Sequence, residues 1–324
     1  SYLIERYLKE GSDPGMLEKA IEDGLIVWHG LPLTTHTELM DGKLFEYGLS
    51  ISKRLDGRFG RNTIAAKMTD VPSHTHAMAP YLAKAGIKYL HIGINGSSKM
   101  VKLPPLCRLR YGEDEVILDY AALYGASSVC GDCAMEFAHT PDNSGPPSPE
   151  SVAAEMERLK VKYPGAEIAS GTMDEFAEVV LEHIDELPVV TEELGDTWIH
   201  GVATDPYKTG AYYELLRLRD QWEKEEPGAV DSPAWREFCG SLLMVCEHSW
   251  GRDVKRWLSD WRNWEKQDFY RARERDHITP EDVMPAGELL REFTLHSEPT
   301  FVAGLCSYKL MEESWTEQRG YIQE

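Results

Sequence analysis

The chain has 324 residues, 42% of them hydrophobic and 27% charged, which is the composition of a globular protein with one large and one smaller unit. Its formal net charge of -21 argues against nucleic acid as a partner, because phosphate binding requires clustered Lys and Arg. No run of about 18 apolar residues is present, so we expect no segment that spans a membrane.

The amino terminus and the cysteines bear on the compartment. The chain begins Ser1-Tyr2-Leu3, with neither an initiator methionine nor a signal peptide, so we expect it to begin inside a longer protein. Six cysteines without regular spacing indicate thiols and a cytoplasmic location rather than a disulfide scaffold. Cys130 and Cys133 form a single CxxC, which we interpret as structural thiols, with a redox pair as the alternative.

From residue 20 to about 205, short apolar runs alternate with helical patterns. The runs predicted to be strands are residues 25–28, 63–68, 89–92, 115–118, 166–169 and 188–191. Helices are predicted at residues 77–86, 148–162 and 173–184. This alternation predicts an α/β fold with a parallel sheet, either open or closed into a barrel.

The loop after the first predicted strand, residues 29–38, concentrates two histidines, three threonines and a carboxylate. In one interpretation these Thr and His side chains tie down backbone groups, and the loop is structural. In the other, His36 and Glu38 project the same way and contact sugar hydroxyls or a metal. Their spacing does not choose between the two.

The segment MTDVPSHT, residues 68–75, follows the second predicted strand. It places Asp70 at the carboxyl end of that strand, where α/β folds hold ligands and catalytic groups. His74 follows within the same turn, and the helix predicted at residues 77–86 comes next. Asp70 is therefore the first candidate for a functional residue.

Two later loops carry further candidates. In residues 137–147, FAHTPDNSGPP, either the turn formers are structural or Asp142 and Asn143 are presented as an acid and a hydrogen-bond donor. Residues 191–201 combine carboxylates with Trp198, as carbohydrate recognition requires, because a pyranose offers C–H faces for stacking and hydroxyls for acceptors. The competing interpretation makes Asp196 a helix or turn cap.

After residue 208 helical apolar spacing dominates, with helices predicted at residues 211–224, 233–250 and 252–275. We expect a small antiparallel bundle and therefore two domains, residues 1–207 and 208–324. His248 lies near the end of a predicted helix. It either caps carbonyls and complements the helix dipole or serves as a metal ligand.

These segments, in this order, resemble the catalytic portion of the family 38 glycoside hydrolases, the α-mannosidases, and more closely an uncharacterised family related to them. The family's aspartate and histidine around a proline-containing turn correspond to Asp70 and His74. Residues 169–176, ASGTMDEF, resemble its strand-to-helix signature, and residues 195–198, GDTW, its Gly-Asp-aromatic loop. His248 best matches the histidine by which the family's three-helix bundle reaches the metal.

The resemblance implies a seven-stranded β/α barrel of the glycoside hydrolase/deacetylase type, followed by an α-helical bundle. It implies a retaining glycosidase with a carbohydrate substrate, in which Asp70 attacks the anomeric carbon and, together with His248, binds one divalent metal, zinc. Asp142 is assigned as the acid that protonates the leaving oxygen. The residues expected to contact substrate are Trp28, His29, His36, Glu38, His74, Asn143, Asp196 and Trp198.

The chain departs from the family pattern in three places. No His-x-Asp motif precedes Asp70, so we expect either that the first barrel strand is missing or that metal is bound differently. His36-Thr37-Glu38 has similar spacing, but the strand before it looks like the second strand of the family pattern, after which the family places substrate contacts. Val71-Pro72-Ser73 replaces Pro-Phe-Gly, which fits a different sugar preference. The β-sandwich domains of α-mannosidases do not follow the bundle, so we expect a truncation at Glu324 and weak metal affinity.

Two rival functions stand beside the glycosidase. A metal-dependent carbohydrate deacetylase would use Asp and His ligands to activate water, and it would need no second carboxyl group across the sugar. A non-catalytic carbohydrate-binding fragment would bind sugar without turnover and without dependence on metal.

Overall fold

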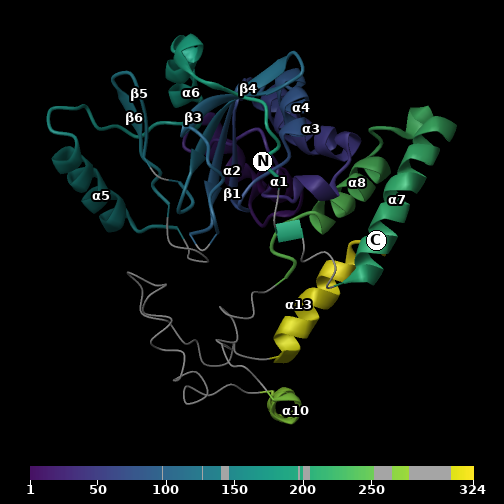
Figure 1. Ribbon diagram of the computed structural model, residues 1–324. Helices are drawn as coiled ribbons and strands as arrows, with labels where there is room; N and C mark the ends of the chain where they lie inside the picture. The colour runs from purple at the N-terminus through teal and green to yellow at the C-terminus, as the bar shows by residue number, and fades with distance from the viewer. Residues whose placement is uncertain are drawn as a thin grey trace. The chain divides into compact units, whose positions relative to one another are not determined.

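The computed structural model describes residues 1–96, 98–125, 127–139, 146–195, 198–199, 205–251, 265–276 and 308–324. The chain divides into two compact units, Ser1–Gly201 and Val202–Glu324. The first is mixed α/β, and the described residues of the second are mainly helical (Figure 1). No helix in these described ranges is both long and apolar enough to cross a bilayer.

A five-stranded sheet forms the centre of the first unit, with the strand order β1-β2-β4-β3-β7. The strands are β1 (Ala65–Asp70), β2 (Tyr89–Ile94), β3 (Leu106–Tyr111), β4 (Asp114–Ala121) and β7 (Val189–Val190). β1, β2 and β4 are parallel, β3 is antiparallel to β4, and β7 is parallel to β3. The predicted α/β class is confirmed, whereas a closed seven-stranded barrel stays a prediction.

Helices pack on both faces of this sheet because its strands alternate between two apolar sets. One face packs against α3 (Gly42–Phe59) and α4 (Ala79–Lys84). The other packs against α6 (Met173–Glu182) and the hairpin of β5 (Ser128–Cys130) and β6 (Cys133–Met135) (Figure 1). The remaining elements of the unit are α1 (Tyr2–Glu10), α2 (Pro14–Glu22), η1 (Thr37–Leu39), η2 (His76–Met78), α5 (Pro149–Lys162) and η3 (Ile184–Glu186).

Two predicted strands are wrong. Residues 25–28 form no strand, because Leu25 and Val27 are 78% and 44% exposed and only Trp28 is buried. Residues 166–169 are largely exposed and are not part of a strand. Both runs are short and apolar, but among the described strands neither run has a partner to supply the backbone hydrogen bonds that would hold it.

The helices of the second unit are α7 (Pro206–Glu225), η5 (Pro227–Ala229), α8 (Pro233–Val245), α10 (Lys266–Arg275) and α13 (Tyr308–Gly320). The prediction of one helix over residues 233–250 is wrong in its last turn, since α8 ends at Val245. Trp250 and Gly251 have φ angles of +52° and +104°, which a helix cannot accommodate. His248 is therefore in the turn after the helix. Residues 252–264, part of the last predicted helix, lie outside the described residues.

Candidate functional site

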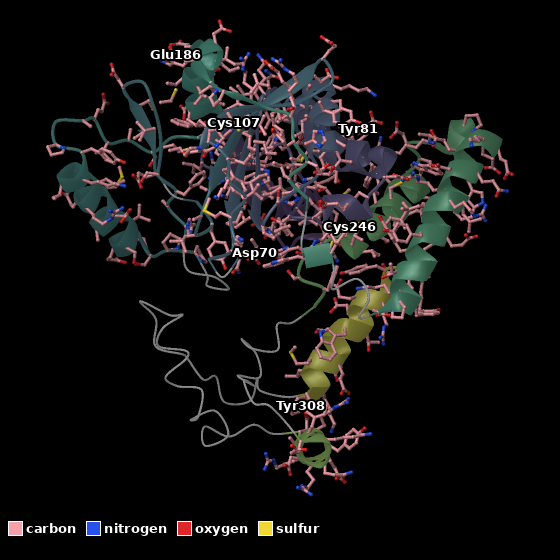
Figure 2. The ribbon with its side chains drawn as sticks, in the orientation of Figure 1. Asp70, Tyr81, Cys107, Glu186, Cys246 and Tyr308 are labelled. Atoms are coloured by element: carbon pink, nitrogen blue, oxygen red, sulfur yellow. The ribbon has the colours of Figure 1, made fainter. Side chains whose placement is uncertain are left out.

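Asp70 ends β1 in a conformation that is costly for a residue with a Cβ. Its φ is +84°, and a non-glycine residue held there costs about 1–3 kcal/mol. Asn95 holds it at two points: the Asn95 backbone N–H donates to the Asp70 carbonyl at 2.8 Å, and its Nδ2 donates to Asp70 Oδ1 at 2.7 Å. Asp70 lies at the end of the sheet (Figure 2). The carboxylate is thus fixed at the position that the sequence singled out.

Tyr124, in the turn after β4, connects Asn95 at the end of β2 with Lys67 on β1. Asn95 Nδ2 also donates to the Tyr124 hydroxyl at 2.9 Å, and the Tyr124 carbonyl accepts a hydrogen bond from Lys67 Nζ at 2.8 Å. The turn that carries Tyr124 lies directly over Gly93, where a Cβ would be 2.2 Å from the Tyr124 carbonyl oxygen. Only glycine at that position of β2 lets the turn approach so closely.

A row of polar side chains crosses the three parallel strands below this turn. Lys67 pairs in register with His91, and His91 pairs with Asp119. Register partners in adjacent strands point to the same face. Lys67 Nζ lies 2.8 Å from His91 Nδ1 and 4.2 Å from the centre of the Phe137 ring. Tyr89 donates to Asp119 Oδ2 at 2.5 Å.

Burial sets the charges of this row. It lowers the pKa of His91 to about 2, with a further contribution from Lys67, so this imidazole is neutral. Burial also lowers the pKa of Lys67 to about 8, against the attraction of Asp119, and raises the pKa of Asp119. Because Lys67 is a donor, His91 accepts through Nδ1 and carries its own proton on Nε2.

This row is not among the residues predicted from the sequence, although the sequence contains a signal for it. Lys67, His91 and Asp119 are single polar residues inside otherwise apolar runs. A buried parallel strand is normally apolar throughout. One titratable residue in each of three such runs indicates a buried polar layer once the runs are placed side by side.

The loop of residues 29–38 reaches the end of β1, so two of the predicted segments come together. The Thr34 hydroxyl accepts from the Thr69 N–H at 3.0 Å. The Thr37 hydroxyl oxygen lies 3.4 Å from His74 Nδ1, and His74 is fully buried.

His36 and Glu38 differ in exposure. His36 is 1% exposed, whereas Glu38 is half-buried and its carboxylate accepts from the Thr37 hydroxyl at 3.1 Å. The same Thr37 oxygen accepts from the Thr75 N–H at 3.1 Å. The threonines of this loop therefore do tie down backbone groups, as one of the two interpretations held.

The loop after β7 joins the same region through Glu193. Its carboxylate accepts from the Thr75 hydroxyl at 2.8 Å and from the His76 N–H at 3.0 Å, and it lies 2.8 Å from His76 Nδ1. Although burial raises the pKa of Glu193, these hydrogen bonds lower it to about 2. Trp198 is half-buried, and Asp196 lies outside the described residues.

Trp28 is buried, and His29 is half-buried with its Nδ1 atom enclosed. Trp28 is 7% exposed, donates to Asp56 Oδ1 at 2.9 Å and packs on Phe59 at 5.9 Å between ring centres. Burial, with the amino-terminal ammonium and Lys67 nearby, lowers the pKa of His29 to about 3. Trp28 has the surroundings of a core side chain.

The remaining candidates fall in other parts of the chain. His248 belongs to the second unit, where its Nδ1 lies 2.7 Å from Glu247 Oε1. Burial raises the pKa of Glu247, but the hydrogen bond with His248 outweighs burial and keeps this pKa below its usual range. The predicted pairing of His248 with Asp70 stays a prediction. Asp142 and Asn143 lie outside the described residues.

The described residues by themselves do not supply a complete set of zinc ligands, and the predicted zinc stays a prediction. A structural or catalytic zinc takes three or four protein ligands. Within the described ranges, no group of three or more His, Cys, Asp or Glu side chains lies close enough together to hold a metal ion. We therefore derive no chemical step through a metal.

Comparisons with known proteins bear on the second unit. Residues 202–324 match the model of a family described as a domain of unknown function, DUF5054. No curated protein matches the chain. The matched range coincides with the second compact unit, Val202–Glu324.

Proposed function

We propose that this chain is the catalytic portion of a glycoside hydrolase that resembles the α-mannosidases, with Asp70 as its nucleophile. The observation that carries the proposal is the strained conformation of Asp70, with φ at +84° and Oδ1 held by Asn95 at 2.7 Å. Strained backbone clusters at active sites, because only a functional requirement maintains it against its cost. The polar loops around the following turn supply the hydroxyl-binding groups that a sugar needs.

In the proposed reaction the Asp70 carboxylate attacks the anomeric carbon as the glycosidic C–O bond breaks. A glycosyl ester forms, and a second carboxyl group gives its proton to the leaving oxygen. Water then attacks the ester, the second group takes a proton from that water, and Asp70 is released with the configuration retained. The hydrogen bond from Asn95 orients the attacking carboxylate.

The second carboxyl group has to lie about 5–5.5 Å from Asp70. Asp119 is two strands across and three residues back, so the two Cα atoms are roughly 14 Å apart. It is excluded as this acid. Asp142 stays the proposed acid.

The seven-stranded barrel, the substrate contacts and the zinc ligands are parts of the same proposal. A seven-stranded β/α barrel would bring the loops after β1, β2 and β4 around one site. Glu38 and Trp198, which are partly exposed, are the proposed substrate contacts, whereas contacts by the buried His36 and His74 stay predictions. A zinc ion bound by Asp70 and His248 stays a prediction, which analysis of the metal content of the purified protein tests.

The experiment is steady-state hydrolysis of a panel of aryl glycosides, α-mannosides first, by the wild type, Asp70→Asn and Asp114→Asn. Asp114 is exposed at the start of β4 and provides the same chemical change far from the site. We expect turnover by the wild type and Asp114→Asn and a loss of at least about a thousandfold in kcat for Asp70→Asn.

Two other outcomes would replace the proposal. Release of acetate from acetylated sugars, without cleavage of any aryl glycoside, would establish the deacetylase. Sugar binding that is insensitive to chelator, without turnover of either substrate class, would establish a binding fragment.

A further inference from the structure

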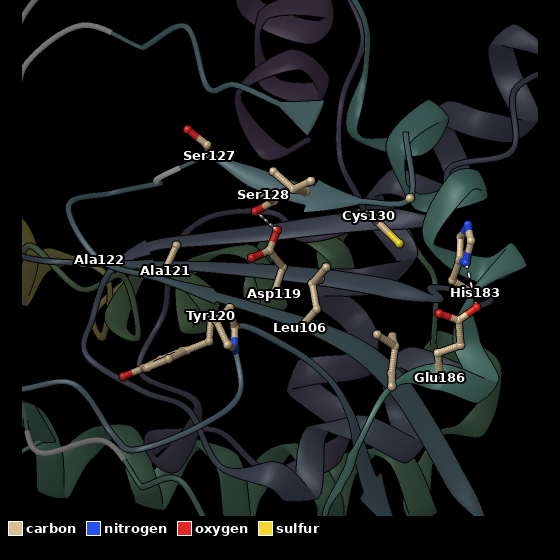
Figure 3. A pocket seen from close by; sticks show the side chains of 14 residues that line it. Leu106, Asp119, Tyr120, Ala121, Ala122, Ser127, Ser128, Cys130, His183 and Glu186 are labelled. Carbon is tan, nitrogen blue, oxygen red and sulfur yellow. Dashed lines mark hydrogen bonds and ion pairs between the residues drawn. The ribbon is translucent and has the colours of Figure 1, made fainter. Parts of the chain in front are cut away.

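A pocket of about 620 Å³ lies in the first unit, on the face of β4 that carries Asp119. Ligand sites for small molecules have volumes of about 300–1,000 Å³, so this pocket can enclose one. Its walls come from β4, the start of β3, the β5–β6 hairpin and the segment that includes η3 (Figure 3). It is not the Asp70 site, since Asp70 is not among the lining residues.

Asp119 is the buried charge of this pocket. The residue is 2% exposed, and both of its hydrogen-bond donors, Tyr89 and Ser128, reach the same oxygen, Oδ2. Figure 3 shows Asp119 directed toward Ser128 of the hairpin. Among the described contacts Oδ1 receives no hydrogen bond. This oxygen is not among the fully enclosed unpaired atoms of the described residues, so a donor that enters the pocket can reach it.

The other lining groups favour a cation as that donor. The lining includes the carboxylates of Asp119 and Glu186 and the imidazole of His183, but no Lys or Arg. His183 Nδ1 is 2.9 Å from Glu186 Oε1, so those two groups compensate each other. Lys67 acts on Asp119 from β1, on the far side of β2, and its hydrogen bonds go to His91 and to the Tyr124 carbonyl.

Apolar side chains complete the pocket. Leu106 and Leu187 line it together with Val129, while Ser127 and Ser128 add hydroxyls. One ionic group inside otherwise apolar walls is the arrangement that selects a small amphipathic ion. The chain as a whole, with a net charge of -21, also draws cations toward its surface.

We propose that this pocket binds a small organic cation, a primary amine with a short apolar body, whose ammonium group donates to Asp119. The apolar body packs against Leu106 and Leu187. This site is independent of the proposed glycosidase reaction, because it contains none of the residues assigned to that reaction.

The test is a calorimetric titration of the full chain with 2-phenylethylamine and with 2-phenylethanol, which match in shape and differ in charge. We expect saturable binding of the amine and at least about thirty-fold weaker binding of the alcohol, because the alcohol leaves the buried carboxylate without an ionic partner. Equal affinity of the two probes, or no saturable binding of the amine, would overturn the proposal.

Variants locate the binding. Asp119→Asn keeps an oxygen that accepts from Tyr89 and Ser128, and we expect it to weaken binding of the amine about thirty-fold. Asp114→Asn, the same change on the exposed end of β4, should leave binding of the amine unchanged. Unchanged binding of the amine by Asp119→Asn would contradict the proposal.

A second variant guards against misfolding of the first. Leu106 lines the pocket, pairs in register with Asp119 and is only half-buried, so Leu106→Ala removes part of the apolar wall with little change to the core. We expect it to weaken binding of the amine at least about tenfold while circular dichroism stays that of the wild type. Full binding of the amine by this folded variant would place it elsewhere and refute the site.

Discussion

At the level of single residues, Asp70 has a strained backbone conformation and is also the proposed nucleophile. An L-residue in the left-handed region places its Cβ close to the following carbonyl, which glycine avoids. The chain nevertheless has a carboxylate at this position, with φ at +84°. A stabilising glycine is easily reached by mutation, so its absence is consistent with a requirement for the side chain.

This strain can be measured by comparing Asp70→Gly with Asp70→Ala. Both variants lose the carboxylate and its hydrogen bond with Asn95, so their difference isolates the backbone. We expect Asp70→Gly to be more stable than Asp70→Ala by about 1–2 kcal/mol in urea unfolding. Equal stability would mean that Asp70 is not strained.

Gly93 makes a second prediction at this scale, because a Cβ there would lie 2.2 Å from the Tyr124 carbonyl oxygen. That neighbour is backbone and cannot turn away, so we expect Gly93→Ala to cost about 1–3 kcal/mol of unfolding free energy. Gly57→Ala is the matched control: Gly57 lies within α3, and a Cβ there would meet no atom within 4 Å beyond the backbone of its own helix, so alanine should stabilise by about 0.5–1 kcal/mol. A neutral Gly93→Ala would show that the Tyr124 turn is not packed on β2.

At the scale of elements, the sequence predicted the strands that have both an apolar run and a partner. β1, β2 and β4 lie where the runs at residues 63–68, 89–92 and 115–118 predicted them. The run at residues 166–169 has the same composition, but no strand lies beside it. Pairing is a tertiary property, and a local pattern cannot report it.

The elements that were missed had local signals of a different kind. α3 begins at an Asp41 N-cap and ends at Gly60 with φ at +67°, which is a standard start and stop. β3 joins β4 through a two-residue turn with Gly112 at φ +62°, which is a hairpin signal. A search for cap and turn residues would have predicted α3 and the β3–β4 hairpin, which hydrophobic periodicity alone did not predict.

Glu193 fastens the loop after β7 to the turn after β1, and its ionisation makes that contact depend on pH. Its pKa is about 2 in the folded chain against 4.5 for an unperturbed glutamate. The stabilisation is therefore fully present above about pH 4.5 and is lost as the pH falls toward 2.

We expect Glu193→Gln to lower the unfolding free energy at pH 7, and we expect the difference from wild type to shrink as the pH falls below about 4.5. Denaturant unfolding at a series of pH values measures this. Glu192→Gln is the control, since the Glu192 carboxylate accepts only from the neighbouring Thr191 N–H in the described part of the chain. A difference that is constant with pH would show that ionisation of Glu193 does not drive the docking.

For the whole molecule, the sequence gives the order of the candidate residues along the chain but not which of them lie close together in space. It identified Asp70, His74, the 29–38 loop and the loop after β7, and the structure joins these segments around one turn. It did not identify the layer of Lys67, His91 and Asp119, because that layer exists only when three strands are in register. Register depends on contacts far apart in the chain.

In the proposed reaction Asp70 forms a covalent bond with a sugar, and this bond can be trapped. The protein is incubated with an activated fluorosugar, 5-fluoro-α-mannosyl fluoride, whose glycosyl ester hydrolyses slowly, and is then digested for mass spectrometry. We expect one added glycosyl group, on the peptide that contains Asp70, and none on Asp70→Asn. A glycosyl group on a different carboxylate, or aryl glycoside turnover with Asp70 left unlabelled, would contradict it.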